Sequence, residues 1–203
     1  MTHTLLGLRL KGFGDAASVA DIIGIDEAEV TANLEQAQTD ELAMLREGGQ
    51  VSGWALMPAG RAKGEELLSA ELDASGGRDV VHGGYEDFLE LNGQMLQLCT
   101  DWQVIEGTET LNDHDDADYD TKVIARLEAL GNELAPILDD LATTLARYGR
   151  YRPRFDVALE KLKGGDLDYF TKPIIPSYHT IWFELHEDLL ATLNIDRASE
   201  GAH

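Results

Sequence analysis

Apolar residues at helical spacing run through most of the chain beyond residue 78, and this pattern constrains the fold more than any other feature. Side chains of this kind recur every three or four positions, as they do on the buried face of an amphipathic helix. The runs cover residues 78–105, 118–148, 154–163 and 177–193. Short links containing Gly164 and Pro176 separate the later ones. Long helices joined by short links are typical of a helical bundle.

The residues before this region show shorter helical runs. The first run ends near Gly12, the second begins at Asp15, and the third covers about residues 27–38. Gly24 separates the second and third runs, and Asp26 stands where the N-cap of the third helix is expected. Two helices joined by a short turn containing glycine are the pattern of a helix-turn-helix.

Two short apolar runs follow the third helix and predict the only β structure of the chain. They lie within residues 42–57, on either side of Gly48 and Gly49, and a glycine pair between such runs favours a β-hairpin. Pro58 then begins another helix. The segment from Asp73 to Arg78 is rich in small residues, which predicts a domain boundary near residue 76.

The segment that leaves the predicted hairpin carries a family resemblance. Residues 56–61 read Leu-Met-Pro-Ala-Gly-Arg, which is similar to the Leu-Thr-Pro-Ala-Gly-Arg-like stretch after the wing of MarR and PadR regulators. The resemblance implies a mainly α protein, with a winged helix-turn-helix at residues 1–76 and an all-α effector-binding or dimerisation domain at residues 77–203. Met57 departs from the family pattern, because threonine at this position would cap the following helix and methionine cannot.

A regulator of this type binds double-stranded DNA as a homodimer and responds to an effector. Polar side chains of the third helix would contact bases, and cations around the hairpin would contact phosphates. The expected DNA-binding residues are Thr31, Asn33, Gln36, Gln38, Arg46, Arg61 and Lys63.

The charge of the chain opposes this expectation. The net charge is −22, and residues 26–41 contain six acidic residues and no lysine or arginine. Such a surface repels nucleic acid. The alternative is therefore an acidic winged-helix module that contacts a protein and does not bind DNA.

An arginine-rich segment interrupts the acidic sequence between the second and third long helices. Residues 147–154 hold four arginines, whose planar guanidinium groups match carboxylates and phosphates. We expect it to border a pocket for a small anionic effector, together with aromatic and histidine side chains of the last helix. The expected ligand-binding residues are Arg147, Arg150, Tyr151, Arg152, His179, Trp182 and His186. Each half of this expectation has an alternative. The arginines can instead neutralise acids of the chain itself, and the histidines can instead be hydrogen-bonded within the bundle.

Several other functions lack a sequence signal. Residues 112–120 are rich in aspartate but fail the EF-hand pattern, because Asp118 replaces its glycine and Ile124 its final glutamate. No phosphate loop, dinucleotide fingerprint or nucleophile beside a base is present, so we expect no enzyme activity, no cofactor and no metal. The single Cys99, the lack of a signal-like start and the lack of a long apolar run predict a cytoplasmic protein without a membrane span.

Overall fold

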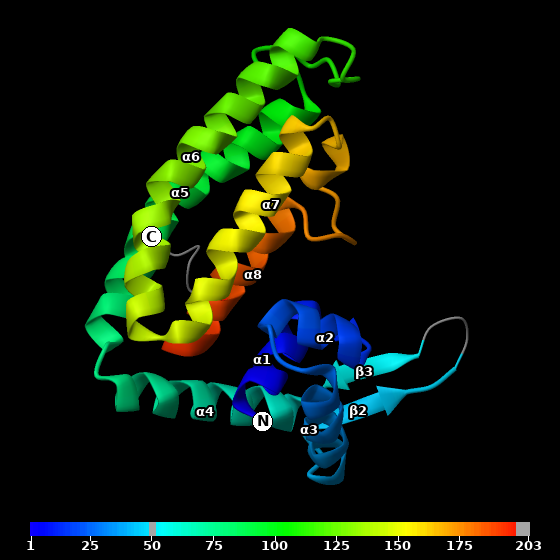
Figure 1. The fold of residues 1–203 in the computed structure, drawn as a ribbon, viewed down its shortest axis with the longest axis vertical. Coiled ribbons are helices and arrows are strands. Elements are labelled where there is room, and N and C mark those ends of the chain that lie inside the picture. The colour runs from blue at the N-terminus through cyan, green and yellow to red at the C-terminus, as the bar shows by residue number, and fades with distance from the viewer. Residues whose placement is uncertain (49–51, 198–203) are drawn as a thin grey trace. The chain divides into compact units, whose positions relative to one another are not determined.

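The computed structural model describes residues 1–48 and 52–197 of the 203-residue chain. The chain divides into two compact units, and the ribbon in Figure 1 shows their elements. Residues 1–78, together with those from Glu187 onward, form the N-terminal unit, and residues 79–186 form the helical unit. The protein is mainly α-helical, as the sequence predicts.

Within the residues that the structure describes, the N-terminal unit contains four complete helices and three short strands. Its helices are α1 (Thr2–Lys11), α2 (Ala16–Ile23), α3 (Glu27–Thr39) and α4 (Pro58–Ser75). Its strands are β1 (Phe13–Gly14), β2 (Ala43–Arg46) and β3 (Gly53–Leu56). They pair antiparallel in the order β1-β3-β2, so that the third strand lies in the middle.

Local capping explains where the helices of this unit begin and end. The Asp15 carboxylate accepts a hydrogen bond from the Ser18 N–H, and the Asp26 carboxylate accepts from the N–H groups of Ala28 and Glu29. Gly24 ends α2 with φ 67°, a left-handed conformation that glycine adopts without steric cost. These caps match the helix limits that the sequence predicts. Asp26 caps α3 as expected, and Met57 at the start of α4 makes no side-chain cap.

The prediction that residues 42–57 hold the only β structure is wrong, because Phe13 and Gly14 add a strand to the free edge of β3. Two residues are too few to show a periodic pattern in the sequence. Gly53 permits this pairing, since a Cβ on it would lie 2.8 Å from the Phe13 ring. The predicted turn residue Gly49 lies outside the described residues.

Gly60 in the Pro-Ala-Gly-Arg segment also has a packing reason. A Cβ at this position would lie 1.9 Å from the carbonyl oxygen of Leu42, which makes any larger side chain impossible without movement of the backbone. The same carbonyl accepts a hydrogen bond from the Met57 N–H. The start of α4 is therefore held against the residue that precedes β2.

The core of the N-terminal unit is apolar and draws on all its helices. It also includes Ala191 of α8 (Tyr178–Leu193), so the second half of that helix packs in this unit. The helical domain predicted at residues 77–203 therefore includes residues that pack in the N-terminal unit. The amphipathic pattern of one continuous helix does not reveal that its two halves are buried in different cores. The central core residues, each almost fully buried, are Leu5, Leu6, Leu8, Val19, Val30, Leu34, Ala37 and Leu68.

The helical unit consists of two long helices, shorter helices and the first half of α8. Its long helices are α5 (Arg78–Gln103) and α6 (Ala117–Thr144), and they are followed by η1 (Ala146–Arg150), α7 (Tyr151–Lys163) and η2 (Leu167–Tyr169). The predicted helix that would start at residue 154 begins at Tyr151 instead. Among the described residues after 78, the only β pairing is one isolated bridge between Val104 and Leu111.

None of the helices in the described parts of the chain combines the length and the apolar composition needed to cross a membrane.

Candidate functional site

Helix α3 has a buried apolar side and an exposed polar side. Val30, Leu34 and Ala37 are completely buried and fix the helix on the core. The opposite side, which we call the α3 face, is exposed. It consists of Glu27, Ala28, Glu29, Ala32, Glu35, Gln36, Gln38 and Thr39.

Three of the four predicted base-contacting residues are engaged within the protein. The Thr31 hydroxyl donates to the Glu27 carbonyl at 2.8 Å, and the Asn33 amide donates to the Thr4 hydroxyl at 3.1 Å. The Gln36 amide donates to the Asp40 carboxylate at 3.0 Å. Gln38 is exposed. Asn33 is half-buried and belongs to the packing of α3 on α1 rather than to an exposed surface.

Two of the three predicted phosphate-contacting cations lie beside acids of the same unit. Lys63 pairs with Glu66 at 2.8 Å, and Arg61 lies 3.9 Å from the Glu187 carboxylate. Arg46, at the end of β2, is exposed, and its Nε approaches the Met44 sulfur at 3.4 Å. Arg46 is therefore the predicted cation best placed to meet a phosphate.

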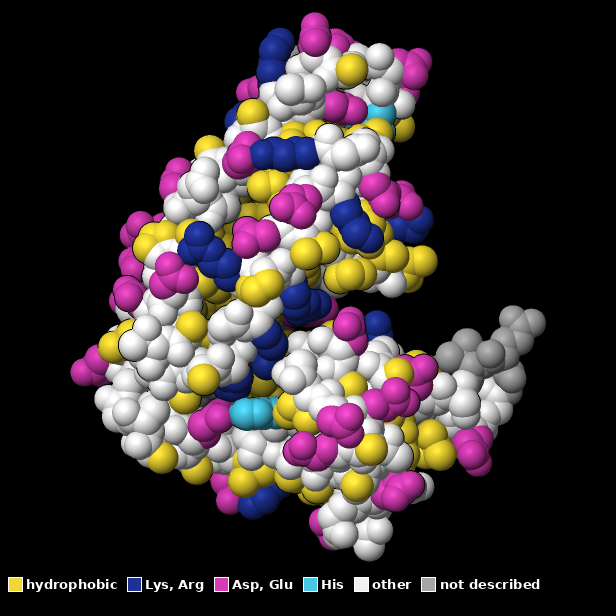
Figure 2. All heavy atoms as spheres, viewed as in Figure 1, with side chains coloured by type: hydrophobic (Ala, Val, Ile, Leu, Met, Phe, Trp, Pro, Cys, Tyr) yellow, Lys and Arg dark blue, Asp and Glu magenta, His cyan; other side chains and the backbone are white. Residues whose placement is uncertain are grey.

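Acidic side chains dominate the surface around α3, as the space-filling view in Figure 2 shows. Glu27, Glu29 and Glu35 lie on the α3 face, and Asp26 and Asp40 adjoin its two ends. The N-terminus of a helix attracts anions through its free N–H groups. Here the Asp26 carboxylate already accepts from two of those groups, and two glutamates in the first turn add further negative charge. The geometry thus repels a phosphate where a DNA-reading helix would attract one.

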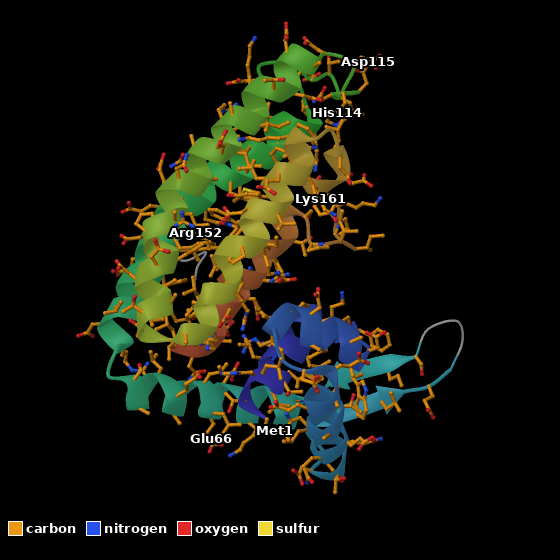
Figure 3. The ribbon with its side chains drawn as sticks, in the orientation of Figure 1. Met1, Glu66, His114, Asp115, Arg152 and Lys161 are labelled. Atoms are coloured by element: carbon orange, nitrogen blue, oxygen red, sulfur yellow. The ribbon has the colours of Figure 1, made fainter. Side chains whose placement is uncertain are left out.

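The arginine-rich segment forms η1 and the start of α7, where it meets acids of the helical unit. Arg154 pairs with the buried Glu184 carboxylate of α8 at 2.6 Å, and Arg152 pairs with Asp139 of α6 at 3.2 Å. Arg152 is labelled in Figure 3. These contacts match the alternative in which the arginines neutralise acids of the chain itself.

The tyrosines of the segment are the partners of its other two arginines. The Arg147 guanidinium lies 4.4 Å from the centre of the Tyr148 ring, and that of Arg150 lies 4.8 Å from the Tyr151 ring. Both rings are fully buried. The Tyr151 hydroxyl donates to the Glu184 carbonyl at 3.3 Å. The segment therefore fixes α7 on α8 through aromatic packing as well as through charge.

The predicted residues of the last helix lie in an aromatic core. The Trp182 indole N–H donates to the Asn92 side chain at 3.0 Å, and its ring lies 4.9 Å from that of Phe88. His186 is also buried against Phe88, at 5.1 Å. His179 is half-buried, and this burial lowers its pKa below the usual value, which favours the neutral ring. Arg152, by contrast, is exposed and pairs with Asp139 of α6.

One polar cluster was missed by the sequence analysis. The buried Asp120 carboxylate lies 3.0 Å from the Nδ1 of His114. It also accepts a hydrogen bond from the side-chain amide of Asn112 at 2.8 Å. The His114 backbone has φ 64°, which is rare for a residue with a side chain, and its ring lies 4.5 Å from that of Trp102. The sequence shows the aspartates of this link, but it does not tell which of them turns inward.

No group of three or more metal-ligating side chains occurs in residues 1–48 and 52–197. The aspartates of the link are used in part for local structure, since the Asp116 carboxylate caps α6 through the N–H groups of Asp118 and Tyr119.

No protein-family model, curated protein or solved structure matches this chain. The function must therefore be inferred from its own geometry.

Proposed function

We propose that the N-terminal unit is a winged helix-turn-helix that recognises a protein with a basic surface through the α3 face. The fold supports the first part of this proposal. Helices α1, α2 and α3 precede the β2–β3 hairpin, with β1 as the third strand, and α2 and α3 are joined by a short turn at Gly24. This is the element order of a winged helix, in which α3 is the helix presented to a partner and the hairpin is the wing.

The single observation that carries the choice of partner is the charge of the α3 face. It holds three glutamates and no lysine or arginine, and the N–H groups at its start already bind Asp26. Charge complementarity steers association and rejects partners of the same sign. A basic protein surface fits this face, whereas a phosphate backbone is repelled by it.

Duplex DNA is the second candidate, and Arg46 is the observation that favours it. This residue is exposed at the end of β2, on the strand that leads into the expected wing, where a cation can contact a phosphate. One such contact contributes little against the acids of α3, because affinity for DNA depends on the number of phosphates neutralised. We therefore rank DNA second, and the helical unit is assigned the role of a ligand-sensing or dimerisation domain in either case.

The test reverses the charge of two glutamates on the α3 face and measures the affinity for the partner protein. A control reverses the charge of two acidic residues elsewhere in the chain. The test variant is Glu29→Lys with Glu35→Lys. The control is Asp87→Lys with Glu90→Lys, two exposed acids of α5 in the helical unit. Proteins crosslinked in cells to the full-length wild type are identified, purified and titrated against all three forms. We expect the α3 variant to bind at least about tenfold more weakly than the wild type, and the control to bind like the wild type.

A selection from random duplexes, run on the same wild-type protein, separates the two candidates. Under the proposal no duplex is enriched. An enriched duplex that is released steeply by salt, and whose binding weakens in Arg46→Ala, would establish DNA as the target instead. Equal affinity of a purified partner for the wild type and for the α3 variant would show that the α3 face is not the binding surface.

A further inference from the structure

A small pocket opens in the helical unit between α6, α7 and the beginning of α8. Its volume is about 140 Å³, close to that of protein cavities that hold one benzene molecule. The ring of Phe155 and aliphatic side chains of α6 and α7 form its apolar part. These aliphatic residues are Leu134, Leu138 and Leu159. The pocket therefore has room for a compact molecule of about six heavy atoms.

A tyrosine hydroxyl without a partner lines this pocket. Tyr178 is 1% exposed, and within the described residues no hydrogen bond reaches its hydroxyl group. A hydroxyl group that lines a pocket and has no protein partner there can hydrogen-bond to water or to a ligand. Gly131 of α6 makes room for this hydroxyl, because a Cβ there would lie 2.7 Å from the Tyr178 oxygen.

The charges around the pocket favour a cation. Its lining contains the carboxylates of Glu128 and Asp156 and one guanidinium group, that of Arg152. Arg152 is paired with Asp139, and Glu128 is paired with Lys163 at 2.5 Å. Asp156 makes no ion pair with any residue of the described chain, and it is the carboxylate left to bind a ligand.

The protonation state of the tyrosine agrees with this charge. Burial raises the pKa of the Tyr178 hydroxyl far above its usual value, and the nearby negative charge of Asp156 raises it further. The hydroxyl is therefore neutral at physiological pH, and its oxygen can accept a hydrogen bond from an N–H donor. The tyrosine and phenylalanine rings, 4.7 Å apart, also present aromatic surface that attracts organic cations.

We propose that this pocket binds a small protonated aliphatic amine, whose ammonium group interacts with the Asp156 carboxylate and the Tyr178 oxygen. The aliphatic part of the amine lies against the leucines and Phe155. The proposed ligand is opposite in charge to the effector expected at the arginine-rich segment, of which Arg152 alone is among the residues that line this pocket. It does not depend on the partner of the α3 face.

The test uses three compounds with one carbon skeleton and different charge, titrated into the full-length protein. The probes are 3-methylbutylamine, 3-methylbutan-1-ol and 3-methylbutanoate, and binding is read from the amide NMR shifts of Gly131, Asn132 and Phe155. We expect the amine to shift these signals at concentrations at least about tenfold lower than the alcohol or the carboxylate. Tighter binding of the carboxylate, or the absence of shifts with all three compounds, would overturn the proposal.

Two variants and a matched control assign the contacts. Asp156→Asn removes the negative charge, so the amine should lose its advantage over the alcohol. Tyr178→Phe removes only the hydroxyl, and we expect the affinity for the amine to fall about tenfold. Asp140→Asn changes an exposed acid of α6 outside the pocket and should leave the titration unchanged. If the preference for the amine persists in Asp156→Asn, the site is not the one proposed.

Discussion

Residues 1–78 and residues 79–186 differ in the polar residues that they bury. In the described part of residues 1–78, Thr4 is the one polar residue that is buried as a whole, and the Arg9 side chain is only 7% exposed where it pairs with Glu65 and Glu187. Residues 79–186 instead bury the carboxylates of Asp101, Asp120 and Glu184 and the imidazole of His186. An apolar core stabilises a fold without specifying chemistry, whereas buried carboxylates require partners at defined positions.

This difference teaches where each unit can act. Residues 1–78 carry most of their charged groups outside, and the α3 face is the exposed polar surface on which the proposed function depends. Residues 79–186 bury several polar groups, and the proposed ligand pocket in this unit is lined in part by Tyr178. Three predictions test whether the comparison holds, in order of decreasing effect.

The largest effect is expected from breaking the ion pair inside the helical unit. Arg154→Met leaves the Glu184 carboxylate buried at 4% exposure without its 2.6 Å partner. We expect the free energy of unfolding to fall by about 3–5 kcal/mol, measured by urea denaturation. Adding Glu184→Leu removes the stranded charge and should recover much of the loss.

The control for this prediction is a surface pair of the N-terminal unit. Lys63→Met breaks the contact with Glu66, whose side chain is 67% exposed, and should change stability by less than about 0.5 kcal/mol. Equal losses in Arg154→Met and Lys63→Met would remove the contrast between a polar interior and a polar surface.

An intermediate effect is expected at the cluster around Asp120. Asp120→Asn replaces an acceptor of His114 and Asn112 by a group that is partly a donor, which we expect to cost about 1–3 kcal/mol. Amide hydrogen exchange should accelerate over residues 104–116, the link that this cluster holds. Asp118→Asn alters an exposed neighbour in the first turn of α6 and should leave that exchange nearly unchanged. Unaltered exchange in Asp120→Asn would show that the cluster does not order the link.

The smallest effect is expected from a cap at the surface of the N-terminal unit. Asp15→Ala removes the acceptor for the Ser18 N–H at the start of α2 and should destabilise this unit by about 1 kcal/mol. In the wild type, hydrogen bonds from the backbone and side chain of Ser18 lower the pKa of the Asp15 carboxyl below its usual value of 3.8. A carboxyl whose pKa is lowered by folding contributes stability above its unfolded pKa, and that contribution is lost as the pH falls through the folded value.

The pH dependence provides the check on this cap. The difference in stability between the wild type and Asp15→Ala, followed by exchange of the α2 amides, should be complete at about pH 6 and should shrink below about pH 4. A difference that persists unchanged in acid would mean that the carboxylate charge does not contribute.

The sequence by itself determined the elements that depend on neighbouring residues. Asp15, Asp26 and Gly24 fix helix ends through bonds and backbone angles within a few positions, so the limits of α2 and α3 could be predicted closely. The same is true of the acidic α3 face, because the 3.6-residue period of a helix and the identities of its residues together predict which side chains share a face. The negative charge of this face can be read from the sequence alone.

Only the tertiary structure decided the features that join distant residues. Strand β1 exists because β3 offers an edge more than 35 residues away, and the second half of α8 packs in the N-terminal unit because Ala191 fits that core. The sequence shows arginines near residue 150 but not that Arg154 meets Glu184 or that Arg152 meets Asp139. A side chain's charge is known from the sequence, whereas its partner depends on how the helices pack.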